Sequence, residues 1–554
     1  MLDKRINCGR LAGGVFAFFC CGVGQAFVID TSNSDWNLRW DTTLKYSAGF
    51  RVQGKEGVLA SDPNINDGDN NFDRGLISNR LDLFTEVDTD FKKWLRFRAS
   101  YAGWYDDVYR GDTDNTGSYG AATYNSLGRS SRQFPGKTRE LMGRDGEVLD
   151  LMGQVNTDLM DMPLTLRLGK HAMFWGESLF FPTLGVSGAM APLDAIKATS
   201  VPNTQARELL LPVNQMSGAL QFGKGTTLEW FYQFEWRPTR LPPPGAYFSP
   251  VDFLPEIGGQ ALLVPAPPPA PPGTLIPLPV VNDLEAKDSG QFGIALRHYS
   301  EKLDADLGIY FVNFHQKGPP NFNLNAAFLP LGPGGALVPV PISVQPFYAE
   351  DIQVTAVSYS GFHLGMNVAG EVSYWHDAPL VSMPAVNLPG VPPFDNDDRP
   401  GYALSDQVHA QISFIRTLTE TKFWEGGNVL GEFALIDVVG FNRNRAARDP
   451  TRDRTAYGFR ALAQPQWYQV LPSLDLTGRL GVGYNFKGNS LAELNFNGNG
   501  ATRGGDVTFG IDFDYKKIWF GGVSYTNFFG SDRPNRLNNY LDRDFVSINI
   551  KRTF

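Results

Sequence analysis

The sequence predicts an all-β fold, a transmembrane up-and-down antiparallel β-barrel of about 18 strands with long extracellular loops. Apolar and polar residues alternate with a period of two in paired segments along the whole chain. The links between these segments alternate between long and short. Strands with apolar residues outward and polar residues inward, joined in this rhythm, are typical of outer-membrane barrels.

The alternation is clearest near the two ends of the chain. In the segment 473–486 the two parities separate by polarity: Leu474, Leu476, Leu480, Val482, Tyr484 and Phe486 alternate with Asp475, Thr477, Arg479 and Asn485. Successive strand side chains point to opposite faces, so one face of this strand is apolar and the other polar. Aromatic residues are frequent on the apolar parity, as they are in 38–52, which favours a lipid-facing strand over one from a soluble sandwich.

Reading the chain in order gives eighteen candidate strands, with sixteen as the alternative number. They are 36–52, 76–89, 94–104, 148–158, 164–174, 216–222, 227–236, 290–299, 304–315, 351–360, 364–375, 405–416, 428–440, 456–464, 473–486, 506–515, 519–529 and 544–554. Short links such as 89–93, 223–226, 300–303 and 516–518 predict periplasmic turns, and the long links predict external loops. Both chain ends then lie on the periplasmic side.

The N-terminus is predicted to be a secretory signal covering residues 1–26, which leaves the barrel as residues 27–554. Lys4, Arg5 and Arg10 precede an apolar run from 11 to 23, and small residues follow at 24–26. The alternative of an inner-membrane anchor is disfavoured because the apolar run is short. The expected location is the outer membrane of a Gram-negative bacterium.

Cysteine content and charge argue against a disulfide-bonded barrel, a lipoprotein and a nucleic-acid-binding protein. All three cysteines, Cys8, Cys20 and Cys21, lie inside the predicted signal, so we expect no disulfide in the barrel. A lipoprotein is disfavoured because Phe18 and Phe19 precede the cysteines where small residues are required. The net charge of −9 and the lack of a basic stripe argue against nucleic-acid binding.

Charged residues on the polar parity are predicted to line the lumen. Opposed charges there set selectivity or hold a polar head group. The alternative is a paired network that stiffens the wall. The candidate residues are Arg80, Asp82, Glu86, Arg96, Arg98, Arg167, His171, Glu177, Arg297, Glu371 and Arg479.

Three predicted external segments are unusually apolar. Residues 237–281 are crowded with proline, residues 318–349 contain no charged side chain before Glu350, and residues 179–193 are similar. Large exposed apolar surfaces usually mark contacts with a protein, a membrane or a ligand. The composition of these loops therefore favours a role in capturing hydrophobic molecules. The alternative is that they fold into the barrel mouth or against another subunit.

One polar segment resembles a calcium-binding loop. Its short carboxylates and amides surround a glycine and could wrap a hard cation: Asp62, Asn64, Asn66, Asp67 and Asp69. The glutamate expected at the end of the helix-loop-helix calcium motif is missing, and a polar external turn is the alternative. Beyond this structural calcium ion, the sequence predicts no cofactor.

An enzyme is not expected. None of the six histidines lies in a recognisable nucleophile motif, and no zinc-binding spacing is present. His376 precedes Asp377 near a strand end, but adjacent residues of a strand point to opposite faces.

Several segments resemble the domain-of-unknown-function family 1302. They are Gly68–Gly75 with Ser78–Leu83, Gly169–His171 with Trp175–Ser178, Asp288–Gly293, Tyr348–Ile352 with Gly370–Glu371, and Asp542–Phe545. The resemblance implies an outer-membrane barrel, often encoded near a lipoprotein-like periplasmic partner and a resistance-nodulation-division transporter of the inner membrane. Such neighbourhoods suggest traffic of hydrophobic compounds, and the family supplies no catalytic mechanism.

The function expected from these observations is passage of hydrophobic or amphipathic small molecules across the outer membrane. The partners would be outer-membrane lipid, the solute, and the periplasmic lipoprotein and inner-membrane transporter that the resemblance implies. One alternative is a specific porin for small polar solutes. Another is a structural barrel that docks a periplasmic lipoprotein.

Overall fold

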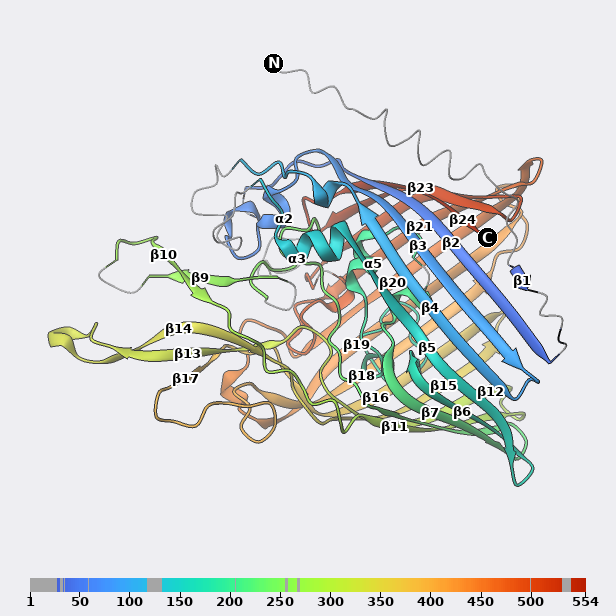
Figure 1. Cartoon of the computed structure of the whole chain (residues 1–554), viewed down its shortest axis with the longest axis horizontal. Coiled ribbons are helices and arrows are strands. Elements are labelled where there is room, and N and C mark those ends of the chain that lie inside the picture. The colour runs from blue at the N-terminus through green and yellow to red at the C-terminus, as the bar shows by residue number, and fades with distance from the viewer. Residues whose placement is uncertain are drawn as a thin grey trace, which may run out of the picture.

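A closed antiparallel barrel forms the body of the molecule in the computed structural model, which describes residues 27–29, 33, 35–57, 59–116, 132–204, 206–254, 258–266, 270–498, 500–530 and 540–554 (Figure 1). The predicted signal, residues 1–26, lies outside the described residues. Each wall strand pairs with its neighbours in chain order, and the last strand pairs with the first.

Eighteen strands of the described residues make up the wall, as the alternation predicts. They are β2 (Trp36–Arg51), β3 (Gly75–Phe91), β4 (Leu95–Asp106), β5 (Arg144–Leu159), β6 (Met162–His171), β7 (Val213–Phe222), β8 (Thr226–Gln233), β11 (Phe292–Ser300), β12 (Ala305–Phe314), β15 (Ile352–His363), β16 (Met366–Pro379), β18 (Leu404–Thr417), β19 (Gly426–Arg443), β20 (Thr455–Leu471), β21 (Leu474–Lys487), β22 (Gly504–Tyr515), β23 (Trp519–Phe529) and β24 (Phe545–Thr553). A short strand, β1 (Phe27–Ile29), pairs with the start of β2.

The seam of the barrel lies between β2 and β24. The register runs from Thr43 opposite Thr553 to Arg51 opposite Phe545. Beyond the last strand, the Phe554 N–H donates to the Thr42 carbonyl at 2.7 Å, and the Thr42 N–H donates to the Phe554 carbonyl at 3.2 Å. The final residue of the chain therefore contributes two backbone hydrogen bonds to closure.

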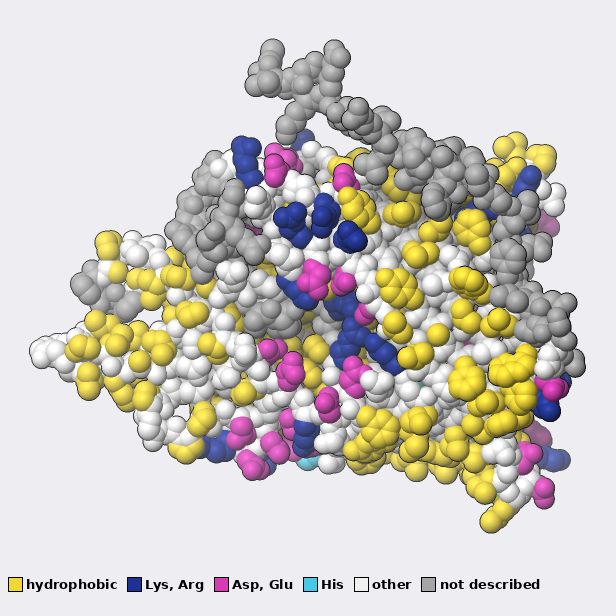
Figure 2. All heavy atoms as spheres, viewed as in Figure 1, with side chains coloured by type: hydrophobic (Ala, Val, Ile, Leu, Met, Phe, Trp, Pro, Cys, Tyr) yellow, Lys and Arg dark blue, Asp and Glu magenta, His cyan; other side chains and the backbone are white. Residues whose placement is uncertain are grey.

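Outward and inward faces separate by polarity along each strand. On β16, Val372 is 51% exposed while its neighbours Glu371 and Ser373 are buried. On β18, Ile412 is 57% exposed and Gln411 is buried. Hydrophobic side chains cover the outer surface of the strands, and charged side chains gather between them and the projecting loops (Figure 2). This surface is what a lipid-embedded barrel requires.

The long and short connections lie at opposite ends, as predicted. The long ones carry additional elements that project beyond the wall (Figure 1): β9 (Ala261–Pro265) with β10 (Leu275–Pro279), and β13 (Asn321–Leu329) with β14 (Val338–Phe347) and β17 (Ala385–Asn387). Their helices are short: η1 (Leu59–Ser61), α2 (Asp67–Asn70), η2 (Val108–Arg110), α3 (Gly136–Thr138), η4 (Arg139–Gly143), α4 (Ser187–Met190), α5 (Ala195–Ser200), α6 (Ala206–Leu209), η6 (Pro333–Gly335), η7 (Arg445–Ala447) and η8 (Phe496–Gly498). In the part of the chain that is described, no helix has the length and apolarity to cross a lipid bilayer.

Strand ends differ from the predicted ones by a few residues, and β20 differs most. The pattern predicts its end at residue 464, just before Pro465, a residue type that lacks a donor for strand pairing. The strand instead continues to Leu471, with Pro465 opposite Gly427 of β19. A Cβ at Gly427 would lie 2.1 Å from the Gln464 carbonyl, so glycine permits this close pairing.

Candidate functional site

The connection between β6 and β7, residues 172–212, runs through the inside of the barrel and is called the inner loop below. Its backbone and side chains contact inward-facing residues of β16, β18 and β19 and, farther around the wall, of β21, β22, β24 and β2. Gln233 of β8 donates to the Met190 carbonyl at 3.0 Å. In the order of the eighteen wall strands, β8 lies nine strands from β22, whose Asp512 accepts from Asn203. The inner loop therefore crosses the lumen.

The first anchor consists of two buried wall carboxylates. Glu371 on β16 accepts the Val186 N–H at 2.6 Å and the Glu177 N–H at 3.1 Å. Glu432 on β19 accepts the Leu179 N–H at 3.1 Å and also that of Phe180. Charge-assisted bonds of this kind are roughly twice as strong as neutral ones. These carboxylates thus fix the inner-loop backbone to the wall.

Two glycines make this contact sterically feasible. Gly176 and Gly185 have φ values of +93° and +63°, which L side chains rarely adopt. A Cβ at Gly176 would lie 2.4 Å from Glu371 Oε2, and one at Gly185 would lie 2.1 Å from Oε1. The Gly185 N–H also donates to Nδ1 of His409 on β18 at 3.2 Å. The close approach of backbone to carboxylate depends on these glycines.

The second anchor lies on β21, β22, β24 and β2. Lys45 of β2 donates to the Pro202 carbonyl at 3.3 Å. The Asn203 amide donates to Asp512 of β22 at 3.2 Å and to Asn549 of β24 at 3.0 Å. Arg479 of β21 bridges Asn203 and Asp512 through its Nη2. A single asparagine therefore connects the inner loop to three wall strands.

The third anchor joins the inner loop to β5 through an arginine of the β8–β9 connection. Asp194 accepts the Lys197 N–H at the start of α5 and pairs with Arg240 at 2.9 Å. Arg240 also binds Glu147 with both terminal nitrogens at 2.7 Å. Opposing carboxylates raise the pKa of Arg240, so its charge is permanent. This triad holds the middle of the inner loop.

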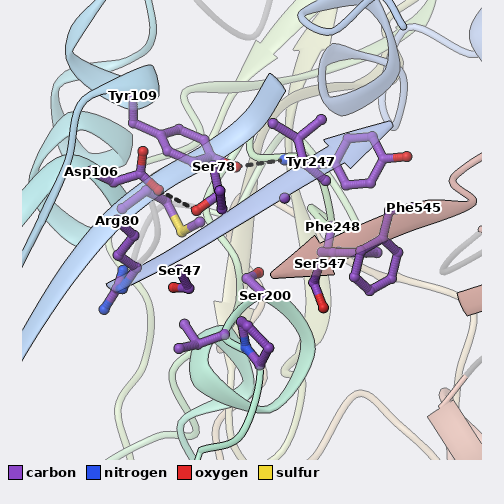
Figure 3. Close-up of a pocket in the computed structure, with 16 residues that line it drawn as sticks. Ser47, Ser78, Arg80, Asp106, Tyr109, Ser200, Tyr247, Phe248, Phe545 and Ser547 are labelled. Carbon is purple, nitrogen blue, oxygen red and sulfur yellow. Dashed lines mark hydrogen bonds between the residues drawn. The ribbon is translucent and has the colours of Figure 1, made fainter. Parts of the chain in front are cut away.

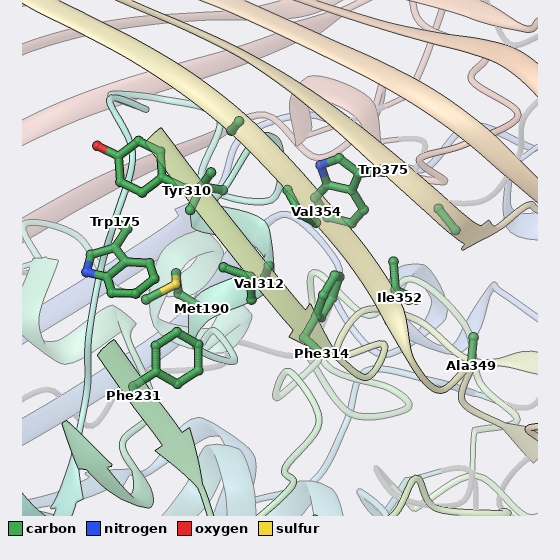
Figure 4. Close-up of a cluster of buried hydrophobic side chains, with 14 of the residues drawn as sticks. Trp175, Met190, Phe231, Tyr310, Val312, Phe314, Ala349, Ile352, Val354 and Trp375 are labelled. Atoms are coloured by element: carbon green, nitrogen blue, oxygen red, sulfur yellow. The ribbon is translucent and has the colours of Figure 1, made fainter. Parts of the chain in front are cut away.

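Apolar packing adds to these polar anchors, as Figure 4 shows. Trp175 and Met190 of the inner loop pack against inward-facing Phe231 on β8 and Tyr310 and Val312 on β12. The Trp175 and Phe231 ring centroids are 5.2 Å apart, and the Trp175 Nε1–H donates to Glu229 at 2.7 Å. Burying each large apolar side chain contributes about 1.5–3 kcal/mol. The apolar segment 179–193 begins and ends within this inner loop, so it follows the alternative in which such segments fold into the barrel.

A small cavity separates the far end of the inner loop from the wall. It has about 20 Å³ of free volume and is lined by Ser47 and Arg80 of β2 and β3, Ser200 of α5 and Tyr247 of an external loop (Figure 3). This volume suits one water molecule rather than a solute. The inner loop is closely seated against β2 and β3 here.

The predicted lumen charges of β3 and β4 occur as ion pairs. Arg80 pairs with Asp82 at 2.8 Å, and Arg98 pairs with Glu86 at 2.6 Å. Arg96 binds Asp90 with Nε at 2.8 Å and Nη2 at 3.2 Å. The structure thus places five of the predicted residues on one stretch of inner wall, each beside an opposite charge.

The remaining predicted lumen residues are distributed around the wall, except for Glu177, which lies on the inner loop. Arg167 donates to Gln154 at 2.9 Å, and His171 Nε2 lies 2.8 Å from Ser217 Oγ. Glu177 lies 3.8 Å from Arg297, and burial raises the pKa of this inner-loop carboxyl. Glu371 and Arg479 belong to the first and second anchors. The predicted residues therefore form several separate contacts, not one binding site.

Other site residues are not predicted by the sequence. Glu432, His409, Lys45 and Asp512 lie on the polar parity of their strands, which is the signal that could have identified them. Asn203 lies in a segment without alternation, and its partners are hundreds of residues away in sequence. No local pattern marks it.

The predicted calcium loop engages several of its oxygens with protein. The Asp62 carboxylate accepts the Asn64 N–H at 3.1 Å, and the Asn64 amide bonds both backbone groups of Leu263 on β9. Asp69 forms ion pairs with Arg51 and Arg543, each at 3.2 Å. Asn66 and Asp67 each keep one buried side-chain oxygen without a hydrogen-bond partner.

The chain was compared with curated proteins and with solved structures. No curated protein matches it. Solved structures of similar outline include OccAB2 of Acinetobacter baumannii (10% identity, 96% of this chain and 99% of that chain, TM-score 0.41). Others are OpdK of Pseudomonas aeruginosa with vanillate (8%, 93% and 98%, 0.39) and a BenF-like porin from Pseudomonas fluorescens Pf-5 (9%, 93% and 98%, 0.41). At this level of similarity, neither the solute nor the mechanism of these proteins can be assigned to this chain.

The family comparison covers the chain almost completely. The model of the family described as "Protein of unknown function (DUF1302)" matches residues 7–554. This range includes every wall strand, all three anchors of the inner loop and the loops that project from the barrel. The chain belongs to the DUF1302 family.

Proposed function

We propose that the protein is an outer-membrane channel that passes hydrophobic or amphipathic small molecules. The projecting hairpins would capture the solute, and the inner loop would control its passage through the lumen. The observation that carries this proposal is the apolar surface of the projecting hairpins at the long-loop end of the barrel.

This apolar surface is exposed beyond the wall. On β13, β14 and the turn between them, Phe328, Leu331, Leu337 and Ile342 are exposed, Leu337 by 65%. Val391, after β17, is also exposed. Figure 2 shows hydrophobic side chains over these projections, separated from the apolar surface of the strands by charged residues. Because this surface lies outside the lipid-facing strands, lipid contact along the wall does not account for it, and the surface supports the proposal of solute capture.

The interior supports an amphipathic solute. Inside the barrel, the apolar side of the inner loop faces β8 to β16, whereas paired charges line β3 to β5. An apolar tail and a polar head group would therefore meet different parts of the inner wall. In the proposed function, these charges would orient such a molecule.

A specific porin for small polar solutes is the second candidate. The observation in its favour is the row of wall ion pairs, which continues on the other side with Arg460–Asp506 at 2.6 Å and Arg479–Asp512 at 2.5 Å. A water-filled lumen lined in this way conducts ions and polar solutes. Docking of a periplasmic lipoprotein stays a prediction from the sequence.

The conductance of the purified protein in a planar bilayer tests the two candidates. The barrel is studied alone and then with a long-chain fatty acid. For the proposed function we expect a closed or flickering barrel with currents that the fatty acid changes. Large steady openings that the fatty acid leaves unchanged would contradict it and favour the porin for polar solutes.

A further inference from the structure

Four buried aspartates meet where the external loops pack on the barrel end. Asp67 and Asp69 lie on α2, Asp252 lies between β8 and β9, and Asp542 precedes β24. All four are at most 3% exposed. Phe72 and Tyr247 belong to the aromatic cluster that packs beside them. The group is therefore sealed from bulk water.

The cations of this group neutralise only half of its charge. Arg51 pairs with Asp69 at 3.2 Å and with Asp542 at 3.1 Å, and Arg543 pairs with Asp69. Lys55, at the edge, is paired with Asp73 at 2.8 Å. None of the ion pairs among the described residues includes Asp67 or Asp252. Two guanidiniums facing four carboxylates leave two negative charges in a buried setting, which is costly without compensation.

The uncompensated pair is held together by backbone hydrogen bonds. The Asp67 N–H donates to Asp252 Oδ2 at 3.0 Å, and the Asp252 N–H donates to the Asn64 carbonyl at 2.9 Å. Ile65 packs with Val251 beneath this contact. The two carboxyl-bearing segments are thus fixed side by side.

Five buried carboxylate and amide oxygens in this place have no hydrogen-bond partner, and one of them, Asp542 Oδ1, belongs to a carboxylate that Arg51 already pairs. The other four lie on α2, its N-cap Asn66 and Asp252. They are Oδ1 of Asp67, Asp252, Asn66 and Asn70. All four residues are more than nine-tenths buried. Asn70 is three residues from Asp67 and four from Asn66 in one helical turn, so the Asn70 side chain neighbours both of these side chains. Buried polar atoms are nearly always satisfied, so four unsatisfied oxygens on α2, its N-cap and the contacting Asp252 indicate that this place binds a ligand.

We propose that this cluster binds one hard divalent cation of the Ca²⁺ class, with Asp67 and Asp252 as charged ligands and Asn66 and Asn70 as amide ligands. Oxygen-only ligands suit such a cation, and two positive charges balance the excess. The site differs from the one that the sequence predicts. Asp62, Asn64 and Asp69 are left out because protein groups engage them, and Asp252 comes from another loop.

Isothermal titration of the chelator-treated, detergent-solubilised barrel with CaCl₂ tests the site at pH 8. We expect one Ca²⁺ per chain for the natural sequence and loss of binding in D252N and D67N. The amide oxygen that D252N introduces can still accept the Asp67 N–H, so this variant should fold. Heat-modifiable migration in gels checks this. D62N is the matched control, in the same loop, and should bind Ca²⁺ normally.

Two further results distinguish a cation from protons as the compensating charge. Ca²⁺ should raise the unfolding temperature of the natural sequence, and D252N without Ca²⁺ should be at least as stable as the chelated natural protein because it removes repulsion. Absence of Ca²⁺ binding at pH 8 in the natural protein would overturn the proposal. So would a folded D252N that binds Ca²⁺ like D62N.

Discussion

At the scale of single residues, backbone-binding carboxylates define the inner loop. Glu371 and Glu432 have no cationic partner among the described ion pairs, and each accepts two backbone N–H groups from the inner loop. A carboxylate can accept on both oxygens, whereas a glutamine offers one acceptor and a donor. The position of the inner loop therefore depends on carboxylate chemistry at these two sites.

The substitution Glu371→Gln is expected to loosen the inner loop, because its NH₂ group would face the N–H of Glu177 or Val186. A buried N–H without a partner costs about 1–3 kcal/mol. Bilayer recordings should show higher or noisier conductance than the natural barrel. Glu301→Gln, in the exposed β11–β12 turn, should leave the recordings unchanged. Identical traces for both variants would show that Glu371 does not hold the inner loop.

Lys317 gives a pH dependence with a defined sign. It lies after β12 and donates to Gln291 at 2.9 Å and to Ala189 of the inner loop at 3.3 Å. Burial lowers the pKa of Lys317 from 10.5 to about 7. Between these values the unfolded chain binds a proton that the folded chain lacks, so this group makes stability rise with pH in that window.

The substitution Lys317→Met removes the titrating amine, and with it this pH dependence of stability, while filling a similar volume. Relative to the natural protein, we expect K317M to be most favoured at pH 7 and to lose that advantage toward pH 10. Urea unfolding at both pH values measures the difference. Lys302→Met, in an exposed turn, serves as the reference. An advantage of K317M that is the same at both pH values would refute the assignment.

At the scale of elements, the wall could be predicted and the inner loop could not. A period of two is a local property, so all eighteen strands follow from it. The inner loop has no such period, and its position depends on Glu371 and Glu432, which are distant in sequence. Glu177 and Glu371 are both predicted as lumen residues, but nothing in the sequence indicates that the Glu371 carboxylate accepts the Glu177 N–H.

Local irregularities also escape prediction. Strand alternation separates His376 from Asp377, but Asp377 has a φ of +54° at a bulge in β16. The two side chains therefore lie 3.5 Å apart, and His376 also contacts Asp406 at 2.7 Å. Hairpins β9–β10 and β13–β14 are likewise not predicted, because prolines in β9, β10 and β14 interrupt the strand pattern.

The β13–β14 hairpin should be the element that captures solute. Replacing its exposed side chains by serine (F328S, L329S, L331S and L337S) removes apolar surface and keeps the length. We expect the fatty-acid effect on bilayer current to weaken while the conductance without ligand stays the same. A second variant shortens the hairpin: an Asn-Gly turn joins Ala327 directly to its pairing partner Val340. We expect this variant to weaken the fatty-acid effect as much as the serine variant does. An undiminished fatty-acid response in both would exclude capture by this hairpin.

At the scale of the whole molecule, paired wall charges predict a lumen with weak ion selectivity. Arg98 is central to this balance because it faces Glu86 at 2.6 Å, Asp150 at 3.5 Å and Asp88 at 3.9 Å. Removing the charge of Arg98 leaves three nearby carboxylates with less compensating positive charge. An excess of one sign in a narrow lumen concentrates ions of the other sign.

The substitution Arg98→Ala is therefore expected to make ionic current through the barrel more cation-selective. The reversal potential in a KCl gradient measures this. Lys224→Ala, in the exposed β7–β8 turn, removes the same charge outside the lumen and should cause little change. A shift of equal size in both variants would mean that total charge, and not the lumen wall, sets selectivity.

The second anchor has a consequence for how the chain assembles. Lys45 is on the first wall strand, and Asn549 is on the last, so Pro202 and Asn203 find all their partners only when β2 and β24 have met. Before β2 and β24 meet, the inner loop can form only part of its second anchor. Docking of the inner loop thus stabilises the closed ring more than any open precursor. A correctly placed inner loop therefore favours closure of the barrel, the final step of folding.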